Sequence, residues 1–148
     1  MDELQDLYRE VILDHNRQPR NFGALPDANH VIDAVNPLCG DKLTLYVKVG
    51  DGRVENISFK GTGCAISVAS SSLMTERVKG QTVRSTLELF EKVHGLLTGA
   101  SDATADLDKL AALAGVREYP TRVKCASLAW HALKAAVTGA DGKPVSTE

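Results

Sequence analysis

The chain has 148 residues and a formal net charge of −2 at pH 7, with 43% hydrophobic and 24% charged residues. This length suits one domain with its own hydrophobic core, and the charge gives no electrostatic support for binding nucleic acid or an anionic membrane. No apolar run approaches the roughly 20 residues that span a bilayer, and the acidic start lacks the features of a secretory signal. Because an odd number of cysteines in such a domain favours a reducing compartment, we expect a cytoplasmic protein.

The first half of the chain predicts one helix followed by three strands. Apolar residues recur at helical spacing over residues 3–15, and a stretch rich in proline, asparagine and glycine then ends this helix. A short strand is predicted over 31–35, and strict alternation predicts a second strand over 42–49. Asp51-Gly52 is a hairpin signal. The strand that returns from it loses the alternation by one residue, which indicates a β-bulge.

From Cys64 onward the pattern is helical. The predicted helices cover residues 65–78, 107–114 and 122–137, and a further helix, capped by Thr82 or Ser85, runs through Leu97. We expect residues 1–138 to form one domain and residues 139–148 to form a flexible tail. The predicted fold class is α+β, with a small antiparallel three-stranded sheet and helices packed on one face.

The three cysteines lie in unusual settings. Cys39 is in a turn-rich stretch, two residues before Asp41, whereas Cys64 follows a glycine-rich stretch and Cys125 a basic one. Three thiols are one ligand short of an all-cysteine tetrahedral site, and the carboxylate of Asp41 is a natural fourth ligand. This combination predicts a metal or sulfur-handling centre. The alternative for each cysteine alone is a small buried apolar residue, and a disulfide is poorly motivated in a reducing compartment.

Local electrostatics favours reactive thiols. If Cys64 and Cys125 lie in first helical turns, the helix dipole stabilises their thiolates. Arg122 and Lys124 add positive charge beside Cys125. Asp41 is a hard ligand among soft thiolates, and we expect it to be the ligand that is most easily exchanged.

These residues resemble the NifU N-terminal and IscU-like family of iron–sulfur cluster assembly proteins. The resemblance covers nearly all of Leu4 to Val137, and four segments carry it: DHNRQPRNFG (14–23), NPLCGD (36–41), GTGCAIS (61–67) and RVKC (122–125). In IscU-type members a histidine precedes the third cysteine, whereas Lys124 stands here, and the stretch from Cys64 to Cys125 is longer. Both departures resemble the SufU branch of the family.

The resemblance implies a zinc-dependent acceptor of persulfide sulfur. The donor would be a SufS-type, pyridoxal-phosphate-dependent cysteine desulfurase, and downstream SUF cluster-assembly proteins would receive the sulfur. Carried onto this sequence, Cys39 is the sulfur acceptor, and Cys39, Asp41, Cys64 and Cys125 hold the zinc. Lys124, Arg122 and His15 are candidate auxiliary residues. No prosthetic group beyond the metal is implied, and neither nucleic acid nor a membrane is expected as a partner.

Two alternatives use the same ligands. One is a scaffold on which a [2Fe–2S] cluster is assembled and then transferred, with iron or the cluster in place of zinc. Lys124 argues against it, because a protonated lysine cannot act as a further ligand. The other is a structural zinc domain, and Asp41 argues against it because structural sites prefer cysteine and histidine. The sequence leaves open whether the chain is an enzyme or a sulfurtransferase-like acceptor that stimulates one.

Overall fold

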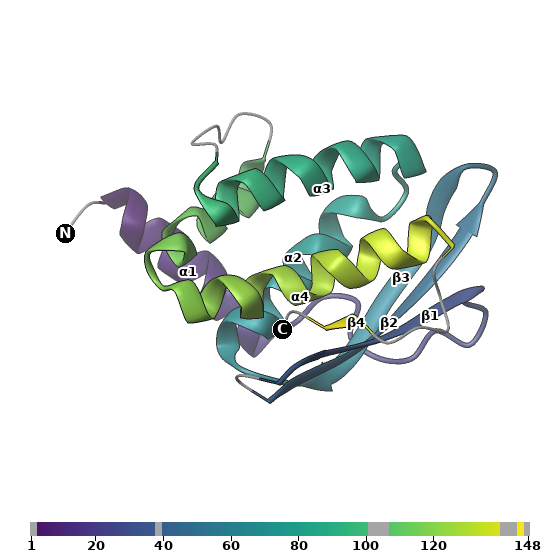
Figure 1. Ribbon diagram of the computed structural model, residues 1–148, viewed down its shortest axis with the longest axis horizontal. Helices are drawn as coiled ribbons and strands as arrows, with labels where there is room; N and C mark the ends of the chain where they lie inside the picture. The colour runs from purple at the N-terminus through teal and green to yellow at the C-terminus, as the bar shows by residue number, and fades with distance from the viewer. Residues whose placement is uncertain (1–2, 38–39, 101–106, 140–144, 147–148) are drawn as a thin grey trace.

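Helices cover one face of a twisted sheet in the computed structural model (Figure 1), which describes residues 3–37, 40–100, 107–139 and 145–146. The strand order is β3-β2-β1-β4. The strands are β1 (His30–Asn36), β2 (Asp41–Gly50), β3 (Arg53–Thr62) and β4 (Val145–Ser146). The helices are α1 (Glu3–Arg17), α2 (Ala65–Val78), α3 (Val83–Thr98), the 3₁₀ helix η1 (Asp108–Glu118) and α4 (Pro120–Val137).

The three longer strands form the antiparallel sheet that the alternation predicts. On β2 the side chains of Leu43, Leu45 and Val47 are buried toward the helices, while the residues between them are more exposed. The pairing of β2 with β3 shifts by one residue between Lys48 and Val49, and this confirms the predicted bulge. The predicted α+β class is thus confirmed.

A fourth strand of two residues extends this sheet. Val145 and Ser146 pair in parallel with Ala34 and Val35 of β1, although they lie in the stretch for which a flexible tail was predicted. Residues 140–144 and 147–148 are outside the described part of the chain, so for them the tail stays a prediction.

Helices α2 and α4 pack against each other and against the sheet, and α1 also packs on α2. Small buried serines on α2 allow α4 to approach closely. The hydroxyl of Ser70 donates to the carbonyl oxygen of Ala126 at 2.6 Å and accepts a hydrogen bond from the indole N–H of Trp130 at 3.1 Å. Ser70 therefore serves the packing of α4 on α2.

The predicted short helix over 107–114 is a longer 3₁₀ helix in the structure. The large buried apolar side chains of its N-cap residue and of the helix recur every third residue, at Leu107, Leu110, Leu113 and Val116. A spacing of three residues places side chains in register along a 3₁₀ helix. Of the helices that the structure describes, none is both long and apolar enough to cross a membrane.

The pairing of β2 with β3 brings the start of β2 next to the end of β3. Lys42 pairs with Thr62, so the first residue of β2 and the residues after β3 are neighbours. Gly61 permits this close pairing: a Cβ atom at this position would meet the backbone carbonyl oxygen of Lys42. Asp41 and Cys64 are consequently placed at one end of the sheet, next to the start of α2.

Candidate metal centre

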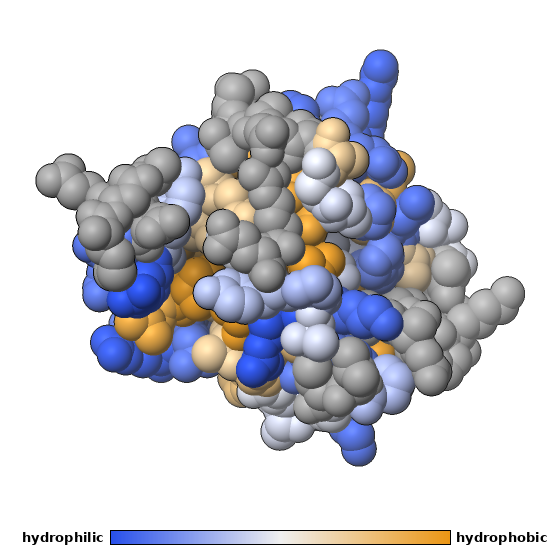
Figure 2. All heavy atoms as spheres, turned by 60° about the vertical axis from the view of Figure 1, so that its left-hand side comes forward, coloured by the Kyte–Doolittle hydropathy of each residue, from blue (hydrophilic) through white to orange (hydrophobic). Residues whose placement is uncertain are grey.

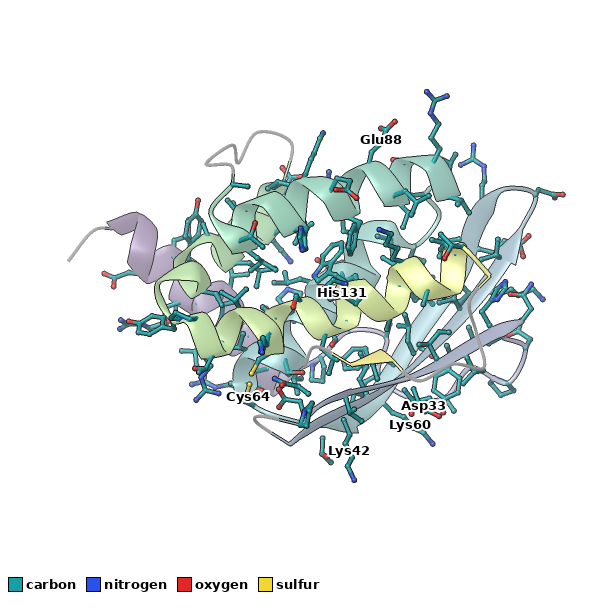
Figure 3. The ribbon with its side chains drawn as sticks, viewed as in Figure 1. Asp33, Lys42, Lys60, Cys64, Glu88 and His131 are labelled. Carbon is teal, nitrogen blue, oxygen red and sulfur yellow. The ribbon has the colours of Figure 1, made fainter. Side chains whose placement is uncertain are left out.

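One carboxylate and two thiols converge at this end of the sheet. One ligand atom from each of Asp41, Cys64 and Cys125 lies within 4.8 Å of the other two. They come from the start of β2, the N-cap of α2 and the interior of α4, and Figure 3 shows Cys64 where α2 begins, close to α4. Because Zn–S bonds are about 2.3 Å long, two thiolate ligands of one zinc ion lie no more than about 4.6 Å apart. The fold therefore brings three of the four predicted ligands together at nearly the required spacing; Cys39 lies outside the described residues.

Asp41 is held firmly at this end of the sheet. Its side chain is only 1% exposed, and its Oδ1 accepts a hydrogen bond from the backbone N–H of Cys64 at 2.9 Å. A Cβ atom on Gly63 would lie 2.7 Å from the same oxygen, so glycine is needed for this approach. The structure thus argues against the expectation that Asp41 is the ligand most easily exchanged.

The two thiols differ in their position on their helices. Cys64 is the N-cap of α2 and is half-buried, which agrees with the expected place at a helix start. The prediction for Cys125 was wrong: α4 begins at Pro120, since proline is well suited to the first helical position, and Cys125 is therefore in the second turn. It is fully buried, with Sγ 3.6 Å from the carbonyl oxygen of Thr121.

Arg122 supplies positive charge to both thiols. A hydrogen bond with Cys125, followed by the charge of Cys64, raises the pKa of its guanidinium above its ordinary value. The side chain is exposed, so it faces the thiols from the solvent side. Lys124 is also exposed. It directly precedes Cys125 on α4, and successive residues of a helix point about 100° apart, so its side chain points in a different direction from that of Cys125.

His15, the remaining candidate, lies in a different network. It is fully buried, and its Nδ1 is 2.7 Å from the hydroxyl oxygen of Ser72 on α2. The same oxygen accepts a hydrogen bond from the backbone N–H of Arg20 at 2.8 Å. His15 therefore joins the end of α1 and the following loop to α2, and it is not one of the three clustered ligands.

The buried position of His15 predicts pH-dependent stability. Burial, and then the charge of Arg20, lowers its pKa below the ordinary value of 6.5. As the pH falls, His15 therefore binds a proton in the unfolded chain before it does so in the folded chain. The contribution of neutral His15 to the free energy of unfolding is present above pH 6.5 and is lost below it. We expect the free energy of unfolding, measured by urea titration between pH 7 and pH 5, to fall less steeply in His15→Gln than in the unchanged chain. His30→Gln, outside this network, is the control, and equal slopes for all three proteins would contradict the prediction.

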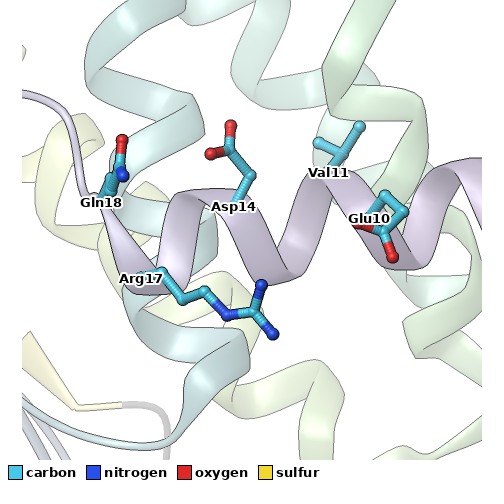
Figure 4. A pocket seen from close by; sticks show the side chains of 5 residues that line it. All are labelled: Glu10, Val11, Asp14, Arg17 and Gln18. Atoms are coloured by element: carbon cyan, nitrogen blue, oxygen red, sulfur yellow. The ribbon is translucent and has the colours of Figure 1, made fainter.

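Two hollows elsewhere on the surface contain none of the three clustered ligands. One runs along α1 and is lined by Glu10, Val11, Asp14, Arg17 and Gln18 (Figure 4). The other lies on the sheet face opposite the helices, where Asp33, Lys42 and Lys60 point outward (Figure 3). In the view of Figure 2, hydrophobic surface occurs as separate patches among hydrophilic residues. Asp41, Cys64 and Cys125 are instead close enough together to hold one metal ion, so this cluster is the best candidate site among the described residues.

Sequence reasoning missed Asn36, which contacts two of the three ligands. Its amide nitrogen lies 3.4 Å from Oδ2 of Asp41 and 3.4 Å from Sγ of Cys125. A signal was present in the sequence, because Asn36 begins the segment that contains Cys39 and Asp41. Its contact with Cys125 depends on how α4 packs over β1, which no local pattern reveals.

The fold and the cluster together define a class of protein: an α+β domain that brings two thiols and a carboxylate from separated segments to one point, where they could hold a metal ion. The sequence model of the NifU-like N-terminal domain matches residues 7–146, and the chain belongs to this family. This confirms the resemblance found in the sequence.

Named relatives of the chain fall into two functional groups. It is 41% identical over 140 residues to the zinc-dependent sulfurtransferase SufU of Bacillus subtilis, covering 94% of this chain and 95% of that protein. It is 39% identical over 138 residues to the iron–sulfur cluster assembly scaffold protein IscU of Streptococcus pyogenes, covering 93% and 86%. Among solved structures, the N-terminal part of a nitrogen-fixing NifU-like protein from Brucella abortus has a TM-score of 0.83 at 25% identity, covering 93% and 96%.

Proposed function

We propose that this chain is a zinc-dependent acceptor of persulfide sulfur in iron–sulfur cluster assembly. A SufS-type, pyridoxal-phosphate-dependent cysteine desulfurase donates the sulfur, and downstream SUF proteins of the cytoplasm receive it. The observation that carries the proposal is the convergence of Asp41, Cys64 and Cys125, with the positive charge of Arg122 beside the two thiols. The similarity to a zinc-dependent sulfurtransferase supports the same assignment.

The described residues fit a zinc ion. Two thiolates and one carboxylate are ligands that zinc accepts, and Cys39 would complete a tetrahedral set. Four anionic ligands around a divalent ion leave a net charge of about −2. Arg122 offsets part of this charge from the solvent side, where it can interact with the site without occupying a ligand position.

Sulfur transfer requires a nucleophile, and the proposal assigns this role to Cys39. The thiolate of Cys39 attacks the terminal sulfur of the desulfurase persulfide, forming a new S–S bond. The original S–S bond breaks, and the desulfurase cysteine leaves as a thiolate, so atoms and electrons balance. When bound, zinc keeps its cysteine ligands deprotonated. Asp41 and Cys125 are buried, and in this proposal they keep their positions during the transfer. The N–H of Gly40, directly before Asp41, donates a hydrogen bond to the carbonyl oxygen of Asn36 at 2.8 Å.

The scaffold function is the second candidate, because the chain is also similar to IscU of Streptococcus pyogenes. A [2Fe–2S] cluster would use the same thiols. Lys124 favours sulfur transfer, since a protonated lysine offers no lone pair to iron. A purely structural zinc domain is disfavoured by the carboxylate of Asp41 in the cluster, since structural sites prefer cysteine and histidine.

The function is tested by measuring metal content and desulfurase stimulation together. We expect the aerobically purified protein to contain about one zinc per chain and to increase the turnover of a SufS-type desulfurase several-fold. Removal of zinc with a chelator should abolish the increase, and adding zinc back should restore it. Purification with a labile brown cluster, and no effect on the desulfurase, would instead establish the scaffold function.

A further inference from the structure

Asn36 occupies the point where the strand, the turn and the last helix meet at the metal centre. It is the last residue of β1, it pairs with Asp41 of β2, and it is fully buried. One amide nitrogen reaches two ligands from different elements, with 3.4 Å to Oδ2 of Asp41 and 3.4 Å to Sγ of Cys125. The contact with sulfur has an ordinary length, whereas the contact with oxygen is long for an N–H donor.

The orientation of this amide is set by the two ligands. Its oxygen, Oδ1, is buried and has no hydrogen-bond partner in the part of the chain that the structure describes. An acceptor buried in this way costs about 1–3 kcal/mol. The reverse orientation would place the oxygen against a carboxylate oxygen and a sulfur atom, both of which carry negative charge at a metal site. The observed orientation instead places the amide nitrogen, the donor atom, on the side of the ligands.

We propose that Asn36 is a positioning residue of the metal centre, which fixes the Asp41 carboxylate and the Cys125 sulfur relative to each other. Together with the N–H of Cys64, it places a donor on each carboxylate oxygen. Donation to a thiolate also reduces the charge on its sulfur, so Cys125 remains a ligand and is a poor nucleophile. Exchange of a ligand is thereby directed away from Asp41 and Cys125. The inference rests on the proposed function only in taking these residues to hold zinc.

The test compares Asn36→Leu, which keeps the approximate shape but removes the amide, with the unchanged protein. Partners of metal ligands typically affect metal affinity 10–100-fold. We therefore expect zinc affinity, measured by competition with a chromophoric chelator, to fall by about that factor. The protein loaded with Co²⁺ should show altered thiolate-to-metal and d–d absorption bands, because these report ligand geometry directly.

Ser70→Ala is the matched control. It removes a buried hydrogen bond between α2 and α4, and Ser70 is not one of the clustered ligands. It should lower thermal stability while leaving zinc affinity and the Co²⁺ spectrum unchanged. If Asn36→Leu does not fold, Asn36→Ala is measured in the same way.

The inference would be overturned if folded Asn36 variants keep the affinity and spectrum of the unchanged protein, or if Ser70→Ala changes both to the same extent. Failure of the unchanged protein to bind zinc would overturn the inference and the proposed function together. Weaker zinc binding by the Asn36 variants, in a protein that does not stimulate the desulfurase, would support the inference and contradict only the proposed function.

Discussion

Replacing Asp41 with alanine is expected to reduce zinc affinity by at least about 100-fold, a larger loss than the 10–100-fold typical of a residue that only supports a ligand. Two effects combine. The substitution removes an anionic oxygen from the cluster, and it leaves the backbone N–H of Cys64 without its acceptor and the amide of Asn36 without one of its two. Leaving a buried donor unsatisfied also costs about 1–3 kcal/mol of stability. Competition with a chelator measures the affinity, and thermal unfolding measures the stability.

Two further variants separate these effects. Asp41→Asn keeps the size and an oxygen that can accept from Cys64, but it lacks the charge, so it should restore stability more than zinc affinity. Asp33→Ala is the control, because Asp33 accepts a hydrogen bond from Thr44 on the exposed face of the sheet and points away from the helices (Figure 3). Unchanged zinc affinity in Asp41→Ala would remove this residue from the ligand set.

Much of this site could be predicted because it depends on strand pairing. Alternation over residues 42–49 and the turn at Asp51-Gly52 define the hairpin, and its register places Lys42 opposite Thr62. That pairing in turn brings Asp41 next to Cys64, which lies two residues after β3. The convergence of these two residues is therefore a consequence of local patterns that the sequence displays.

The missed features depend on where helices begin and how they pack. The start of α4 was expected at Arg122, but the structure places it at Pro120, and this shift moves Cys125 from the first turn to the second. The contact of Asn36 with Cys125 follows from the packing of α4 on β1. The 3₁₀ helix η1, by contrast, has a visible signal in its period of three.

Cys39→Ser is expected to abolish the stimulation of the desulfurase while the chain still binds zinc. Serine is nearly the same size as cysteine but cannot form the persulfide, so transfer should fall to the background measured without this protein. Asp41, Cys64 and Cys125 would remain as a three-residue site, with water in the fourth position, as in open zinc sites. Desulfurase turnover measures the stimulation. Mass spectrometry measures persulfide formation, as an added sulfur atom of about 32 Da on the chain.

The matched variant is Cys64→Ser, which changes the same atom at a clustered ligand. Cys64 and Cys125 supply the two thiols of the described cluster. Loss of one of them should therefore weaken zinc binding strongly, and sulfur transfer should fall with it. The two variants thus separate accepting sulfur from holding the metal. Persulfide on Cys64 or Cys125 in the Cys39→Ser protein, with desulfurase stimulation intact, would assign the acceptor role to another cysteine. Equal loss of zinc in both variants would instead show that Cys39 is as much an anchor of the metal as Cys64.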